Sequence, residues 1–202
     1  WSGTRPPTRP TRWSPLPATV GGVYFAVSGD FDGDRDDDIF FYDPTWGDHL
    51  WLSNGTANGF ADRQVSVPGG YRPVAGDWNG DGIDDIFWYR PGPASDRVWT
   101  FGANGGHTTT AANAGGTSTT WPVAGDFDGN GFDDILFYTP GSTSSIWRHN
   151  PNGHTTTSVT TGAGYSVRSG DVNGDSRDDL VWHHPATGTV RLWFGRINGT
   201  FT

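Results

Sequence analysis

Four short stretches of the sequence place Asp or Asn at alternate positions and end in a pair of aspartates. They start at Asp30, Asp77, Asp126 and Asp171 and read DFDGDRDDD, DWNGDGIDD, DFDGNGFDD and DVNGDSRDD. On a curling backbone, alternate side chains can set their oxygens on one concave side, and Ca²⁺ takes about six to eight oxygen ligands at roughly 2.3–2.6 Å. Without a cation, such crowded carboxylates repel and raise one another's pKa values. The stretches therefore predict up to four Ca²⁺ sites, one in each.

The predicted ligands follow one scheme in all four stretches. Positions 1, 3, 5 and 9 supply side-chain oxygens, and position 7 adds its backbone carbonyl, as in an EF-hand loop. The side-chain ligands are Asp30, Asp32, Asp34 and Asp38; Asp77, Asn79, Asp81 and Asp85; Asp126, Asp128, Asn130 and Asp134; and Asp171, Asn173, Asp175 and Asp179. The backbone ligands are Asp36, Ile83, Phe132 and Arg177.

Other features distinguish these stretches from EF-hand loops, which are flanked by helices. Position 8 is Asp in every stretch (Asp37, Asp84, Asp133 and Asp178), with a role left open between an outer-shell acceptor and a strand cap. No Glu follows at position 12, and a strand-like run follows instead of a helix. The alternative is a set of Asp-Gly turns without metal, which four copies in register disfavour. Because 18 of the 22 aspartates lie in the stretches, four Ca²⁺ ions would change the net charge from −9 to about −1.

The stretches are expected in loops, because strand-like runs flank each of them. An apolar run follows each one (DIFFY, DIFWY, DILFY and DLVWH), which predicts a strand buried on both faces. A third strand with Trp51, Trp99, Trp147 or Trp193 and a polar, Thr-rich fourth strand complete each unit. The first aspartates of successive stretches are 47, 49 and 45 residues apart, a spacing typical of propeller blades. The predicted fold class is all-β: a β-propeller of four blades, each of about 47 residues and four strands.

The repeats form one predicted domain, because such units bury their faces only against their neighbours. Residues 1–10 have the composition of a Pro-rich linker, and 11–202 form the propeller. Its units are predicted at 20–70, 71–119, 120–164 and 165–202. The last unit keeps only a stub of its fourth strand, RINGTFT, and we expect residues 11–19 to supply that strand and close the ring.

The D-x-[DN]-G-[DN]-x-x-D-D-[IL] pattern resembles FG-GAP (VCBS-type) repeats, the blades of integrin α-subunit propellers and of many secreted bacterial proteins. The resemblance covers residues 20–202. It implies Ca²⁺ between the first and second strands of each blade, and secretion or surface display. Position 6, often Gly in the family, is Arg35 or Ser176 in two loops, which predicts weaker sites because a left-handed backbone suits Gly. The family usually has seven blades; four leave open a closed small ring, an eight-bladed pair or a fragment.

Composition excludes several functional classes. The net charge of −9 and a sequence pI of about 4.8 disfavour nucleic acid as a partner. No apolar run approaches the ~20 residues of a membrane span, so no membrane insertion is expected. The chain has no Cys and no Gly-x-Ser-x-Gly elbow, and the loop aspartates are assigned to metal, so we expect no enzyme activity.

Binding is therefore the predicted function, and two kinds of ligand stay open. One is a glycan, bound by a lectin-like carbohydrate- or cell-surface-binding module. The other is a surface protein or a second copy, in an adhesion or assembly module. Aromatic side chains suit both, but those that recur once per blade are expected in the core. The candidate ligand-binding residues break the repeat: Trp46, Trp121, Arg90 and His184. The variable turn positions Asp43, Arg90, Thr139 and His184 are expected to be exposed.

Overall fold

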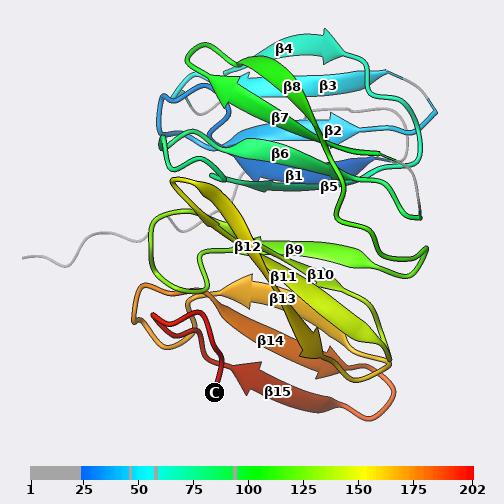
Figure 1. Ribbon diagram of the computed structural model, residues 1–202. Helices are drawn as coiled ribbons and strands as arrows, with labels where there is room; N and C mark the ends of the chain where they lie inside the picture. The colour runs from blue at the N-terminus through cyan, green and yellow to red at the C-terminus, as the bar shows by residue number, and fades with distance from the viewer. Residues whose placement is uncertain (1–23, 46, 57–58, 93–94) are drawn as a thin grey trace, which may run out of the picture.

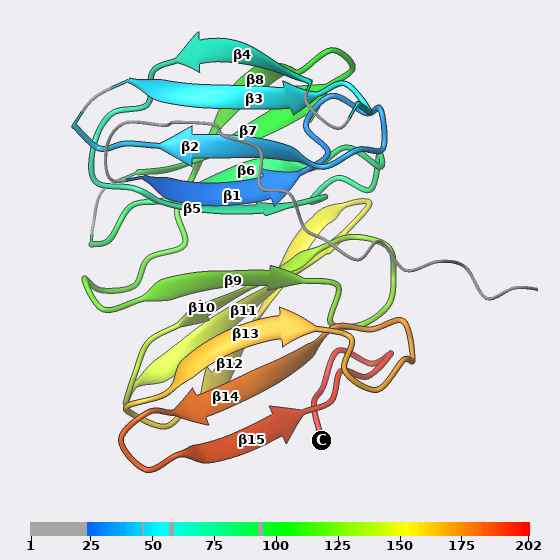
Figure 2. The same cartoon turned by 180° about the vertical axis from the view of Figure 1, so that it is seen from behind.

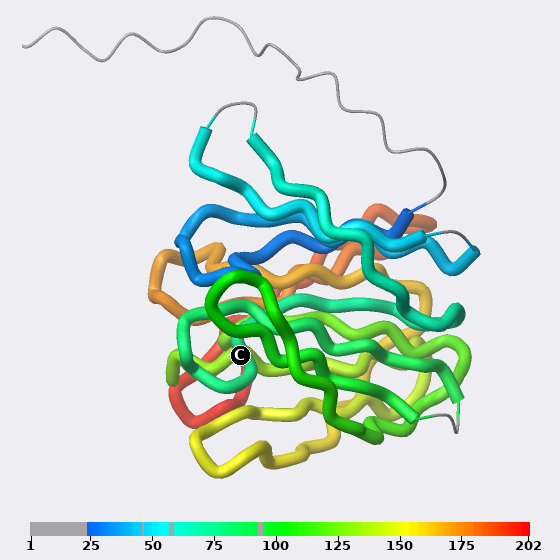
Figure 3. Tube along the Cα trace, turned by 90° about the horizontal axis from the view of Figure 1, so that it is seen from above, coloured from blue at the N-terminus to red at the C-terminus, as the bar shows by residue number. Residues whose placement is uncertain are grey.

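The computed structural model describes residues 24–45, 47–56, 59–92 and 95–202. All strands and sheets in these residues form four antiparallel blades that follow one another along the chain (Figure 1). Each blade is completed before the next one begins, as the trace in Figure 3 shows from above. No helix in the described part of the chain is long and apolar enough to cross a membrane. The predicted all-β propeller with four blades is confirmed.

The strands of each blade run in sequence order from the inner to the outer edge. Blade 1 contains β1 (Phe25–Gly29), β2 (Asp38–Tyr42), β3 (Asp48–Ser53) and β4 (Phe60–Val65). Blade 2 contains β5 (Arg72–Gly76), β6 (Asp85–Tyr89), β7 (Asp96–Gly102) and β8 (Gly106–Ala112). Blade 3 contains β9 (Trp121–Gly125), β10 (Asp134–Tyr138), β11 (Thr143–Asn150) and β12 (Gly153–Thr160). Blade 4 contains β13 (Ser166–Gly170), β14 (Asp179–His184) and β15 (Thr189–Trp193).

Blade 4 has three strands of its own within the described residues, which agrees with the prediction that the C-terminal RINGTFT segment is only a stub. The chain after β15 turns back at Gly199, whose φ is 70°, and only an isolated bridge joins Gly195 to Phe201. Backbone bonds between Phe194 and Thr202 hold the stub against the end of β15, so it makes no fourth strand of its own. Residues 11–19, expected to complete this blade, and the linker 1–10 lie outside the described residues.

The core lies between the blades. All five residues of β6 and of β10 are buried, as predicted for second strands covered on both faces. Phe40 of blade 1 packs edge-on against Trp88 and Trp99 of blade 2, with ring centroids 5.2 and 5.8 Å apart. Similar contacts join blade 2 to blade 3 and blade 3 to blade 4. The inner strands β1, β5, β9 and β13 are neighbours in this order, and Figure 2 shows them from behind.

Strand register is the same in every blade and fixes where the acidic loops lie. The glycine that ends each inner strand pairs with the aspartate that starts the second strand. These pairs are Gly29 with Asp38, Gly76 with Asp85, Gly125 with Asp134, and Gly170 with Asp179. All four loops therefore leave their blades at the same end of the inner strand.

Candidate functional site

The aspartate at position 1 organises each acidic loop through backbone hydrogen bonds. In the first loop, Asp30 Oδ1 accepts the N–H groups of Gly33 and Asp34 at 2.7 and 3.1 Å, and Oδ2 accepts that of Arg35 at 2.8 Å. The same three bonds form on Asp77, Asp126 and Asp171 in the other loops. The curled backbone that the spacing predicts is present in all four loops.

Two positions in each loop have a left-handed backbone. Position 4 is always glycine, with φ between 74° and 80°. Position 6 is Gly82 or Gly131 in two loops, but Arg35 and Ser176 hold φ values of 76° and 65° in the others. The expectation that position 6 must be left-handed is therefore confirmed, and the weaker binding of those two loops stays a prediction.

The aspartate at position 9 is fully buried and ties its loop to the third strand or, in blade 4, to the chain just after that strand. Its Oδ1 accepts a backbone N–H at 2.7 to 2.9 Å in every blade; the pairs are Asp38 with Ser53, Asp85 with Phe101, Asp134 with His149, and Asp179 with Gly195. Burial is the main cause that raises the pKa of Asp38 to about 6, that of Asp85 to about 7 and that of Asp134 to about 8. The backbone bonds lower these values but do not outweigh burial.

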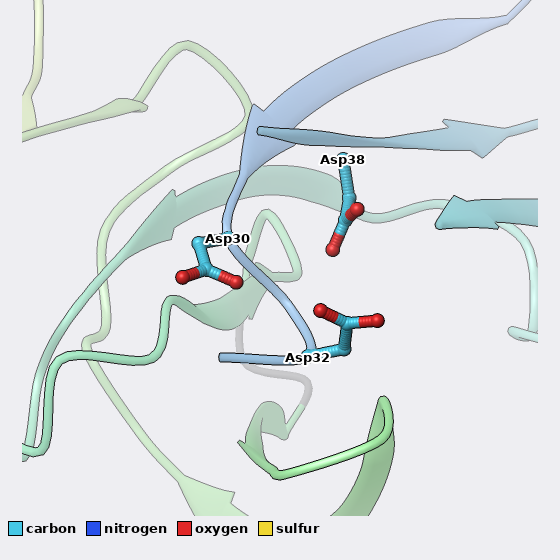
Figure 4. A group of neighbouring side chains, drawn as sticks. All are labelled: Asp30, Asp32 and Asp38. Carbon is cyan, nitrogen blue, oxygen red and sulfur yellow. The ribbon is translucent and has the colours of Figure 1, made fainter. Parts of the chain in front are cut away.

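The first loop brings three of its four predicted side-chain ligands together. Asp30, Asp32 and Asp38 place one oxygen each within 4.8 Å of the others, and their carboxylates face a common space in Figure 4. Asp34 lies outside this group, and its Oδ1 accepts the N–H of Asp36 at 2.9 Å. Within the described residues, only this loop forms such a group of three.

The third loop leaves two carboxylate oxygens without a hydrogen-bond partner. These are Oδ1 of Asp128 and Oδ2 of Asp134, both buried. Burial also raises the pKa of Asp128, and the charge of Asp126 adds to the shift. Crowded, oxygen-only donors with raised pKa values and unsatisfied oxygens match the ligand preference of a hard divalent cation. The residues present thus fit Ca²⁺.

The second and fourth loops arrange the same positions differently. In the second, the Asn79 amide nitrogen lies 3.3 Å from Asp85 Oδ2, so a half-turn of the amide would present its oxygen instead. In the fourth, the Arg177 guanidinium lies 2.5 Å from Asp175 Oδ2 and neutralises a predicted ligand. The backbone-carbonyl role of position 7 stays a prediction in every loop; its N–H binds the position 5 side chain in each.

Position 8, whose role the sequence left open, links adjacent blades. The Asp84 carboxylate of blade 2 accepts the Asp30 N–H of blade 1 at 2.9 Å, and the Asp84 N–H donates to the Asp30 carbonyl at 2.8 Å. Asp133 forms the same pair of bonds with Asp77. Asp178 donates its N–H to the Asp126 carbonyl at 2.8 Å, and the Asp126 N–H bonds to the Asp178 carboxylate. We call this arrangement the interblade lock.

Two buried aspartates outside the loops were not predicted from the sequence. Asp48 and Asp96 are each 1% exposed. Asp96 accepts the N–H groups of Arg90 and Ala114, both at 2.7 Å, and so joins the turn after β6 to the chain after β8. Each lies three residues before the recurring tryptophan of the third strand, a signal that could have identified them.

Trp121 lies at the opposite end of β9 from the acidic loop. Its side chain is 46% exposed, and the Arg72 guanidinium stacks 3.8 Å from its ring centroid. Arg72 is held there because it donates to the carbonyls of Thr120 and Ser118. Trp121 borders a groove of about 330 Å³, whose other lining residues include Tyr138, Tyr165 and Arg168. We call this hollow the Trp121 groove.

The other candidate ligand residues do not join this groove. Arg90 is exposed and lies over the ring of Tyr71, 5.5 Å from its centroid. His184 is half-buried with its ring 5.0 Å from that of Tyr165. Trp46 lies outside the described residues.

The expectation that the variable turn is exposed is wrong at two of its positions. Asp43 is 3% and Thr139 is 8% exposed. Their side chains cap the local backbone or bond a buried neighbour: Asp43 Oδ1 accepts the Thr45 N–H at 2.8 Å, and the Thr139 hydroxyl lies 2.7 Å from that of Thr120. Sequence variation here reflects different ways of closing the turn.

Known proteins match the chain in both sequence and structure. A family model described as an FG-GAP-like repeat matches residues 30–88, 77–137 and 126–182. Among solved structures, a lectin from Agrocybe aegerita, described as recognising non-reducing terminal N-acetylglucosamine, is similar with a TM-score of 0.66 and 17% identity. That similarity covers 90% of this chain and 52% of the lectin, so this chain spans about half the lectin's length. No curated protein sequence matches the chain.

Proposed function

Because this chain belongs to the FG-GAP-like repeat family, we propose that it is an extracellular module, stabilised by Ca²⁺, that binds carbohydrate without transforming it. The observation that carries the carbohydrate proposal is the Trp121 groove. It combines an exposed indole with tyrosines and an arginine in one concave site, and binding sites commonly pair aromatic walls with a few polar groups. The specificity described for the lectin makes a glycan ending in N-acetylglucosamine the first ligand to test.

The acidic loops support the calcium part of the proposal. A bound Ca²⁺ would supply the positive charge that offsets the crowded carboxylates of each loop. Asp30, Asp32 and Asp38 would contribute oxygens in the first loop, and Asp128 and Asp134 in the third. Extracellular calcium modules bind Ca²⁺ with a Kd of about 10⁻⁴–10⁻³ M. Such weak affinity suits loops in which one residue has a strained backbone or one carboxylate is already paired with an arginine.

Calcium and sugar would act at opposite ends of the blade. The loop follows Gly125 at one end of β9, and Trp121 starts the same strand at the other. Five residues of strand span roughly 17 Å. The cation would therefore support sugar binding by stabilising the scaffold, not by contacting the sugar.

A direct test measures binding of N-acetylglucosamine-terminated oligosaccharides by calorimetry, after a screen on a glycan array. We expect Trp121→Ala to weaken binding by at least about tenfold, because the aromatic wall of the groove is lost. Phe25→Ala is the matched control: it alters the equivalent residue of blade 1, which is 43% exposed and lies outside the groove. Absence of binding to any glycan, or equal affinity in Trp121→Ala, would contradict the proposal.

A further inference from the structure

A row of ring side chains crosses each blade on the face that meets the preceding blade. In blade 2 the row runs through Tyr71, Trp88, Trp99 and His107, with neighbouring ring centroids 6.2, 5.1 and 3.8 Å apart. Phe40 of blade 1 packs against this row, and Trp88 is 0% and Trp99 6% exposed as a result. We call this row the ladder; blades 3 and 4 have equivalent ones, covered by the blade before them.

Blade 1 carries a ladder too, but no described blade precedes it. Tyr24, Phe41, Trp51 and Phe60 follow one another with centroids 5.8, 5.0 and 5.7 Å apart. Phe41 and Trp51 are only half-buried, and Phe60 is 41% exposed. A continuous row of partly exposed aromatic side chains, ending in the exposed Phe60, is typical of an interaction site.

The far face of blade 4 shows the complementary situation. The residue at loop position 2 covers the next blade in blades 1 to 3, where Phe31, Trp78 and Phe127 are 0%, 7% and 0% exposed. Its counterpart in blade 4, Val172, is 51% exposed. Leu192 is 44% exposed, while its counterpart Ile146 in blade 3 is 1% exposed. The far face of blade 4 therefore carries the residues that cover the next blade in an interblade interface. Within the described residues, no blade lies against it.

The interblade lock ends at the same two places. Blades 2, 3 and 4 each use the position 8 aspartate to bind position 1 of the blade before. At the two ends, Asp37 of blade 1 and Asp171 of blade 4 are exposed, and within the described residues neither forms this lock. The chain thus carries one partner of a lock beside each uncovered face: the position 8 carboxylate of Asp37 in blade 1 and the position 1 N–H of Asp171 in blade 4.

We propose that the ladder of blade 1 binds the far face of blade 4 of a second copy, in a contact that repeats the interfaces between blades. The Asp37 carboxylate of one copy accepts the Asp171 N–H of the other, and Val172 and Leu192 cover Phe41, Trp51 and Phe60. The partner of this face is a second copy, because the contact needs an acidic loop whose position 1 N–H is not already bound to a position 8 carboxylate. Within the described residues, Asp171 of blade 4 is such a position. Such a head-to-tail contact closes into a ring if the rotation allows, here of eight blades from two copies.

The test combines two variants, each blocking one face. Phe60→Asp disrupts the ladder and Leu192→Asp the face of blade 4; both residues are exposed, so a thermal melt should show both variants folded. Light scattering should give the unmodified chain a mass that rises with concentration from 21.8 kDa toward twice that value. Each variant alone should stay at 21.8 kDa, and an equimolar mixture should recover a one-to-one pair through the two intact faces. Phe25→Asp, on blade 1 outside the ladder, is the control and should associate normally.

A second pair of variants tests the lock itself. Asp37→Ala should weaken association by about tenfold, because the position 1 N–H of the partner copy loses its acceptor. Asp37→Asn keeps a side-chain oxygen as acceptor at the same position and should restore most of the association. A mass of 21.8 kDa at every concentration, a pair that survives both face variants, or a mixture that fails to pair would each overturn the proposal.

Discussion

Two of the buried aspartates at position 9, Asp85 and Asp134, make the stability of the metal-free protein depend on pH. Burial raises the pKa of Asp85 to about 7 and of Asp134 to about 8, from 3.8. Asp133, in the lock, shifts to about 7 for the same reason. An acid with a raised pKa in the folded state holds its proton there at a pH where the unfolded chain has released it. The free energy of unfolding therefore falls as the pH rises from the unfolded-state pKa through the folded-state pKa.

We therefore expect the unfolding free energy, measured by urea denaturation in excess chelator, to fall between about pH 6.5 and pH 8. The comparison starts at 6.5 because burial lowers the pKa of His149 from 6.5 to about 4, which has the opposite effect at lower pH. Saturating Ca²⁺ should reduce the decline, since a cation favours the ionised carboxylates. A stability that rises over this range in chelator would contradict the assignment.

The left-handed backbone at position 6 gives a second residue-level prediction. Arg35 holds φ 76°, where a side chain costs about 1–2 kcal/mol and glycine does not. Arg35→Gly should stabilise the protein by about 0.5–1 kcal/mol, after the greater freedom of glycine in the unfolded chain is subtracted. Arg97→Gly is the control: Arg97 is exposed in β7 and not left-handed, so the change there should destabilise. Chemical denaturation of both variants decides between these signs.

Between elements, the interblade lock joins loops that are far apart in sequence. Asp133→Ala removes the acceptor of the Asp77 N–H in a half-buried position and should lower the unfolding free energy by about 1–3 kcal/mol. Asp37→Ala changes the equivalent residue of blade 1, which has no such bond in the described structure. In dilute, monomeric protein it should change stability by less than about 0.5 kcal/mol. Equal losses in the two variants, measured by urea denaturation, would show that the bond to Asp77 contributes little.

The repeat made the elements predictable. Four copies of one pattern fixed the loops, the doubly buried second strands and the tryptophan-bearing third strands, because each copy constrains the others. The lock was not predictable, since position 8 contacts a neighbouring blade and nothing in the spacing of Asp84 or Asp133 identifies that partner. The turn at Asp43 and Thr139 was misjudged for a related reason: variable residues can be buried when each closes its turn with a different hydrogen bond.

At the scale of the whole molecule, calcium should stabilise the propeller by mass action. A ligand bound by the folded state alone adds about 2.7 kcal/mol at one hundred times its Kd. We expect chelation to lower the melting temperature, measured by differential scanning fluorimetry, and calcium but not magnesium to restore it, because the smaller ion requires near-octahedral geometry. An unchanged melt after chelation would contradict calcium binding.

The number of blades in the working assembly is what the sequence could least determine. Blade 4 lacks a described fourth strand, and both end faces resemble interior ones in residue type. Whether such faces are covered depends on packing between distant or separate segments, and no local pattern at Phe60 or Leu192 encodes it.

The locks connect the blades in series, each joining only one blade to the next. A pull on the two ends of the chain would therefore apply the same force to every lock, and the molecule should lengthen in discrete steps as the interfaces open, the weakest first. In optical tweezers this would appear as a sawtooth, with each tooth releasing roughly the contour length of one repeat. A contact between the two end faces would leave no blade with an uncovered side. The closed assembly should then need a higher force to unfold, although each contact is no stronger than those between the blades.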